Sequence, residues 1–174
     1  MTWPPPAPIV AAAAVVVAAS AYDLRTRRIP NALTIGAAAV AVVLHGVLSG
    51  WSGVLVAVAG WTVGLVLFFP LFALGGMGAG DVKLLAAIGA WLGPMGAVCT
   101  ALYGAIAGGI MALVVSFARG YTSTALGNVG RILRSWLVTG IHPVEGLTLD
   151  SSSGPRLPYA LALATGTIVT IWMQ

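Results

Sequence analysis

Long apolar runs, separated by short clusters of glycine and polar residues, dominate the chain. A helix that crosses about 30 Å of hydrocarbon needs roughly 20 predominantly apolar residues. Stretches near that length lie at about 8–22, 32–49, 53–74, 82–97, 98–118 and 157–173. The pattern predicts an all-α, polytopic membrane protein with about six transmembrane helices. Because no internal repeat or linker divides these runs, residues 1–174 are predicted to form a single membrane-embedded domain.

A different periodicity appears between the fifth and sixth apolar stretches. Apolar residues recur there at the spacing of one helix face, with two arginines beside them. These residues are Leu126, Val129, Leu133, Trp136 and Leu137, with Arg131 and Arg134. The segment is predicted to be an amphipathic helix lying on the cytoplasmic surface of the membrane.

Glycine pairs at GxxxG spacing occur within two of the apolar stretches, Gly60 with Gly64 and Gly104 with Gly108. Small residues at this spacing let helices approach closely in a membrane. We expect these pairs to serve packing within the chain rather than dimerisation.

Composition agrees with a membrane protein, since 59% of the residues are hydrophobic and only 7% are charged. A soluble globule would need more polar surface. The net charge of +4 would indicate nucleic acid in a soluble protein, but here we expect no nucleic-acid partner. The single cysteine, Cys99, excludes a disulfide or a CxxC metal site within one chain, and we expect neither a metal ion nor a cofactor.

The membrane topology explains where the Lys and Arg residues lie. With the N-terminus outside, all eight Lys and Arg residues fall in or beside the inside segments, at about 23–31, 75–81 and 119–156. This distribution follows the positive-inside rule. The same topology places Asp23 at the inner end of the first helix and Asp81 at the inner start of the fourth, at one depth on the cytoplasmic side.

Asp23 and Asp81 are therefore candidates for a catalytic pair. An ionisable group at the edge of an apolar segment is costly and indicates function. Paired carboxylates at a site of low dielectric do not both ionise easily, so one keeps its proton while the other stays charged. The charged one could activate water while the neutral one hydrogen-bonds a scissile carbonyl. The pair indicates peptide hydrolysis.

The residues beside Asp81 are candidates for substrate binding. Gly78 and Gly80 allow backbone conformations and close approaches that a side chain would block, so an extended peptide could lie along them. Lys83 lies two residues beyond Asp81, and on a regular helix it points away from that carboxylate. We expect it to be a snorkelling lysine at the interface, with substrate binding as the alternative role.

These motifs carry a family resemblance. Gly78-Ala79-Gly80-Asp81 resembles the GxGD motif of intramembrane aspartyl proteases, and with Val82-Lys83-Leu84 it is similar to the G-x-G-D-x-K-L form of prepilin peptidases. The segment from Asp23 to Asn31, DLRTRRIPN, resembles the first catalytic segment of that family. Pro158-Tyr159-Ala160 resembles the start of its last helix.

The resemblance implies cleavage of the short basic leader from type IV pilin-like precursors at the cytoplasmic face of the bacterial inner membrane. Asp23 and Asp81 match the catalytic aspartates of the family. Larger members also N-methylate the new terminus and carry a further N-terminal region with paired cysteines. Because this chain begins at the first peptidase helix and has one cysteine, it resembles the compact form associated with Flp-type pili. We expect no methyltransferase activity.

Other interpretations stay open. Asp81 could only cap its helix, and Asp23 could only end the first helix and pair with Arg27. The aspartates could form the proton relay of a small transporter, although such groups favour the middle of the bilayer. The protein could also be a non-enzymatic assembly subunit. Tyr22-Asp23 is similar to the Tyr-Asp of presenilin-like GxGD proteases, which leaves that branch as a further alternative.

Overall fold

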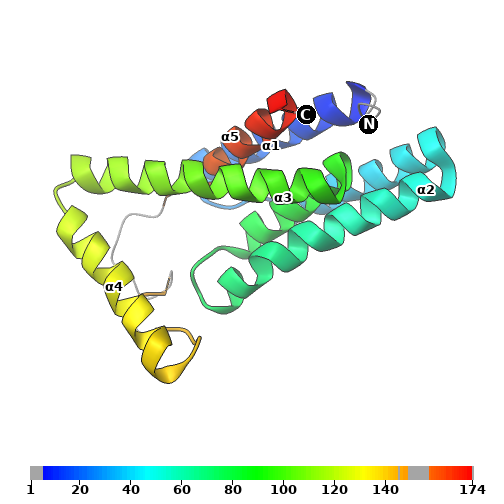
Figure 1. Ribbon diagram of the computed structural model, residues 1–174. Helices are drawn as coiled ribbons and strands as arrows, with labels where there is room; N and C mark the ends of the chain where they lie inside the picture. Colours follow the sequence, from blue (N-terminus) through cyan, green and yellow to red (C-terminus); the bar gives the residue numbers. More distant parts are fainter. Residues whose placement is uncertain (1–5, 145, 149–156, 174) are drawn as a thin grey trace.

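The computed structural model describes residues 6–144, 146–148 and 157–173 (Figure 1). Within these ranges the regular elements are all α-helices, which confirms the predicted all-α fold. In chain order they are α1 (Pro6–Thr26), α2 (Asn31–Ala73), α3 (Ala79–Ala118), α4 (Thr122–Thr139) and α5 (Tyr159–Met173).

Both long helices, α2 and α3, are interrupted by a glycine. Gly50 has φ 61° and ψ −147° in α2, and Gly93 has φ 75° and ψ −179° in α3. Glycine adopts positive φ without steric cost because it has no Cβ. Each helix doubles back at this point (Figure 1), so that residues 31–49 lie against 51–73 and residues 79–92 lie against 94–118. The turn at Gly50 falls between two predicted apolar stretches, whereas the turn at Gly93 falls inside the predicted stretch 82–97, because the glycine ends the first half of α3 with a positive φ.

Among the described residues, three helices, α1, α2 and α3, are long and apolar enough to cross a membrane, and α5 is a shorter apolar helix. The six predicted stretches correspond to α1, the two halves of α2, the two halves of α3, and α5. The chain is therefore a multi-pass membrane protein, while its number of spans stays a prediction.

The first half of α3 lies at the centre of the molecule. Nearly every side chain from Val82 to Trp91 is buried, and this segment packs against α1, α2 and α5. Leu84, Leu85 and Ile88 are fully buried there. Asp81 begins this central segment, so the most enclosed part of the protein supports it.

Glycines bring the neighbouring helices into close contact with α3. A methyl group on Gly60 would overlap the main chain of Gly89, and one on Gly64 would lie 2.6 Å from the carbonyl oxygen of Leu85. On the other side of α3, a methyl group on Gly108 would lie 2.7 Å from the Tyr159 ring of α5. The predicted role of these glycines in packing within the chain is confirmed.

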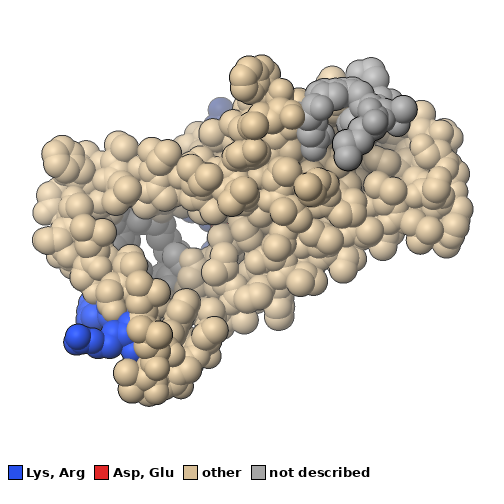
Figure 2. Space-filling view, in the orientation of Figure 1, with Lys and Arg blue, Asp and Glu red and all other residues tan. Residues whose placement is uncertain are grey.

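The predicted amphipathic helix is present as α4, and none of its residues is buried. It runs across the end of the bundle rather than along it (Figure 1). Its apolar face is exposed, with Leu137 87% exposed, and the most prominent basic side chains in Figure 2 lie beside this helix. These features suit a helix at a membrane surface, although its contact with lipid stays a prediction.

Candidate active site

Asp23 lies in the last turn of α1 with a side chain that is only 9% exposed. The helix ends at a left-handed cap, because Arg27 has φ 54° and its N–H donates to the carbonyl oxygen of Asp23 at 2.9 Å. The carboxylate Oδ2 of Asp23 accepts a hydrogen bond from the main-chain N–H of Ala160 at 3.3 Å. Since Ala160 is in the first turn of α5, Asp23 faces a helix N-terminus, which favours negative charge.

Asp81 lies in the first turn of α3 and is half-buried. The N-cap of this helix is Gly78, and the N–H of Asp81 donates to the Gly78 carbonyl oxygen at 3.1 Å. The alternative that Asp81 is an N-cap is therefore wrong, because the helix begins two residues before it. An acidic side chain in a first turn interacts favourably with the helix dipole.

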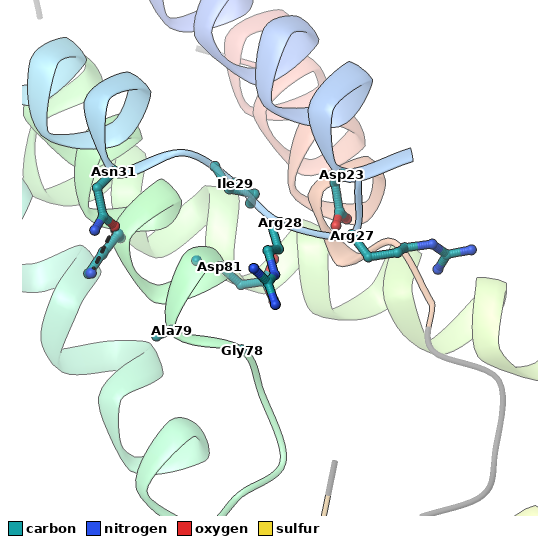
Figure 3. Close-up of a pocket in the computed structure, with 10 residues that line it drawn as sticks. Asp23, Arg27, Arg28, Ile29, Asn31, Gly78, Ala79 and Asp81 are labelled. Atoms are coloured by element: carbon teal, nitrogen blue, oxygen red, sulfur yellow. Dashed lines mark hydrogen bonds between the residues drawn. The ribbon is translucent and has the colours of Figure 1, made fainter. Parts of the chain in front are cut away.

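Both aspartates line one cavity of about 310 Å³. Figure 3 shows that they come from different helices, with the segment that joins α1 to α2 passing between them. The lining residues are Asp23, Arg27, Arg28, Ile29, Asn31, Gly78, Ala79, Gly80, Asp81 and Lys83. The tertiary structure thus brings together the two carboxylates that the sequence analysis paired, and surrounds them with three basic side chains.

The glycines before Asp81 allow close approach. A Cβ on Gly78 would lie 3.1 Å from Oδ2 of Asp81, and one on Gly80 would lie 3.3 Å from Cβ of Ile29. The positive φ of the loop occurs earlier, at Gly75 with φ 72°. Because Gly78 and Gly80 carry no side chain, a peptide could approach their main chain closely beside Asp81.

Lys83 also lines the cavity, and its hydrogen-bond partner there is Asn31. Its Nζ donates to Oδ1 of Asn31 at 3.0 Å, drawn as a dashed line in Figure 3. This bond forms because α2 begins beside α3 and offers an amide acceptor there. The hydrogen bond between Lys83 and Asn31 thus links the start of α3 to the start of α2 at the edge of the cavity.

Two residues that the sequence analysis did not select as site residues, Ser20 and Ala160, make contacts that hold Asp23, although Ala160 belongs to the quoted Pro158-Tyr159-Ala160 motif. The main-chain N–H of Ala160 binds Asp23, and the Ser20 hydroxyl donates to the carbonyl oxygen of Ala160 at 3.2 Å. A main-chain donor leaves no signal in side-chain chemistry. Ser20 is an ordinary small residue among alanines, so only the packing of α5 on α1 reveals it.

The arrangement is suited to acid–base chemistry. Two carboxyl groups from separate helices face a polar cavity at the helix ends, where a peptide segment and water could enter. Among the described residues, no group of three or more His, Cys, Asp and Glu side chains is placed to hold a metal ion. Fold and site together define a multi-pass membrane protein with a paired-aspartate site.

Comparison with known protein families identifies the family within this class of membrane protein. The model of the type IV leader peptidase family matches residues 10–113, a range that contains both aspartates. The chain belongs to the type IV leader peptidase family.

Two relatives with assigned names resemble part of the chain. It is 38% identical over 107 residues to the prepilin leader peptidase/N-methyltransferase of Burkholderia pseudomallei, which covers 58% of this chain and 34% of that protein. It is 32% identical over 122 residues to the type 4 prepilin-like proteins leader peptide-processing enzyme of Escherichia coli O78:H11, covering 63% of this chain and 43% of that protein. The chain thus matches less than half the length of either relative. No solved structure matches it.

Proposed function

We propose that this protein is a membrane aspartic endopeptidase that removes the basic leader from type IV pilin-like precursors at the cytoplasmic face of the bacterial inner membrane. The observation that carries the proposal is the shared cavity, into which Asp23 and Asp81 project from α1 and α3. Membership of the leader peptidase family supports the reaction, and the names of two relatives support the class of substrate.

The proposed chemistry needs one ionised and one protonated carboxyl group, a state that two carboxyls sharing a poorly solvated site favour. The ionised carboxylate takes a proton from water as the water oxygen bonds to the scissile carbonyl carbon. The neutral carboxylic acid hydrogen-bonds the carbonyl oxygen. When the C–N bond breaks, the first carboxyl returns its proton to the leaving amine. All proton transfers are thus accounted for by two carboxyl groups and water.

The position of the cavity suits a substrate that is part peptide and part membrane segment. The cavity lies where α1 ends and where α2 and α3 begin, so a hydrophobic segment could stay among the helices while the preceding bond reaches the aspartates. Gly78 and Gly80 offer main chain for an extended peptide to pair with. Lys83 lies at the same edge and is proposed to contact the peptide.

A proton relay is less well supported. Transport sites favour ionisable groups near the middle of the bilayer, whereas Asp23 lies in the last turn of one helix and Asp81 in the first turn of another. Both groups therefore lie at the ends of their helices.

The decisive experiment compares wild type, Asp23→Asn and Asp81→Asn in membranes, using a pilin precursor from the same genome and a gel shift to detect cleavage. We expect each variant to lose about 10³-fold in rate, within the range that acid–base groups contribute, and to fold normally. Asp150→Asn is the control for the loss of one carboxyl group. More than a tenth of wild-type activity in either site variant would contradict the two-carboxylate mechanism.

A further inference from the structure

Two hydrogen bonds connect α1 to the first turn of α5, and both involve Ala160. The Ser20 hydroxyl donates to the Ala160 carbonyl oxygen at 3.2 Å, and the Ala160 N–H donates to Oδ2 of Asp23 at 3.3 Å. Ser20 precedes Asp23 by three residues, so both side chains lie on one face of α1. One residue of α5 is therefore held at its carbonyl oxygen and at its N–H by two residues of α1.

The residues of this contact are buried. Ser20 is 7% exposed and Asp23 is 9% exposed, while Ala160 is fully buried. A buried hydroxyl group without a hydrogen-bond partner is destabilising. The Ser20 hydroxyl has such a partner in the Ala160 carbonyl oxygen, whereas an alanine at this position would need none. The neighbouring contacts of α1 with α5, made by residues such as Val16 and Leu163, are apolar and therefore not directional.

The N–H of Ala160 is available because it belongs to a helix start. The first N–H groups of a helix have no partner within the helix. In α5 the next N–H, that of Leu161, donates to the carbonyl oxygen of Pro158 at 3.1 Å, which leaves the Ala160 N–H for Asp23. This donor reaches the carboxylate only while the start of α5 keeps its axial position and rotation against α1.

We infer that Ser20 is a positioning residue for Asp23: its hydroxyl fastens the first turn of α5 so that the Ala160 N–H holds the carboxylate in the catalytic cavity. Ser20 does not line that cavity, so it acts through Ala160. The inference deepens the proposed function and rests on it, because its effect is measured on leader cleavage.

The test compares Ser20→Ala with Ser20→Cys, whose thiol has a similar size but donates more weakly. The matched control is Thr170→Val, which removes a buried bond between α3 and α5, from Thr100 Oγ1 to Thr170 Oγ1 at 3.3 Å. Thr170 lies ten residues beyond Ala160, or about 15 Å along α5 at the rise of a helix. The control therefore weakens the docking of α5 without touching its first turn.

We expect kcat for precursor cleavage to fall about tenfold in Ser20→Ala, the loss expected from one hydrogen bond, with KM within about twofold of wild type because the substrate contacts are unchanged. Ser20→Cys should give an intermediate kcat, and Thr170→Val should keep the wild-type kcat even where its thermal stability falls. Amide hydrogen exchange at residues 159–163 should become faster in Ser20→Ala and stay unchanged in Thr170→Val.

The outcomes separate this inference from the proposed function. If the wild type cleaves no precursor, the proposed function fails, while hydrogen exchange still tests the contact with α5. If the wild type cleaves and Ser20→Ala keeps kcat within twofold, Ser20 has no positioning role. An equal loss of kcat in Thr170→Val would also overturn the inference, since the effect would then reflect general loosening of α5.

Discussion

Replacement of Gly64 by alanine should separate the two helices that hold Asp81 in place. Gly64 lies in the second half of α2, and a Cβ there would be 2.6 Å from the carbonyl oxygen of Leu85 and 2.8 Å from Cα of Ala86. Leu85 is one helical turn beyond Asp81. The obstructing atoms belong to the main chain, so no change of side-chain rotamer can relieve the contact.

The size of the effect follows from these distances. Ordinary Cβ contacts begin at 3.4 Å, so the carbonyl oxygen of Leu85 must move by about 0.8 Å relative to α2. Overpacking in a close-packed interior costs typically 1–3 kcal/mol, and we expect about 3 kcal/mol here because only whole helices can move. Misplacement of a catalytic group by 1 Å can cost about 100-fold in rate, so cleavage should slow by between tenfold and a hundredfold.

Gly36→Ala provides the control in the same helix, since a Cβ there meets no atom within 4 Å. Its free energy of unfolding should stay level or rise by up to about 1 kcal/mol, the difference in helix propensity between glycine and alanine. Both variants are compared by denaturant unfolding in detergent, followed by circular dichroism, and by precursor cleavage. The reasoning is refuted if Gly64→Ala is as stable and as active as Gly36→Ala.

Two further predictions concern the loop and the topology. In Gly78→Ala the new methyl group would lie 3.1 Å from Oδ2 of Asp81, so the carboxylate must shift by a few tenths of an ångström and kcat should fall roughly threefold to tenfold; an unchanged kcat would show that this oxygen is free to move. For the topology, Cys99 is first replaced by alanine. Ser52→Cys should then react with a membrane-impermeant thiol reagent in intact cells, and Arg28→Cys only after permeabilisation; the reverse pattern would invert the proposed orientation.

The sequence by itself determined where most of the helices lie and which residues are candidates for the chemistry. Hydrocarbon thickness and the absence of water in the bilayer restrict a spanning chain to long apolar helices, so hydropathy alone located every apolar segment. The turn at Gly50 fell between predicted stretches, but the turn at Gly93 fell within the predicted stretch 82–97, because hydropathy does not detect a glycine with a positive φ. The rarity of acidic residues in an apolar chain identified Asp23 and Asp81.

Only the tertiary structure decided how those residues are held. The start of α3 at Ala79 places Asp81 inside the first turn, and the start of α2 beside it turns Lys83 toward the cavity through Asn31. Ser20 gains its role because α5 packs on α1. The contacts of Lys83 with Asn31 and of Ser20 with Ala160 join segments far apart in the chain. Periodicity and composition are local properties, so they carry no information about such contacts.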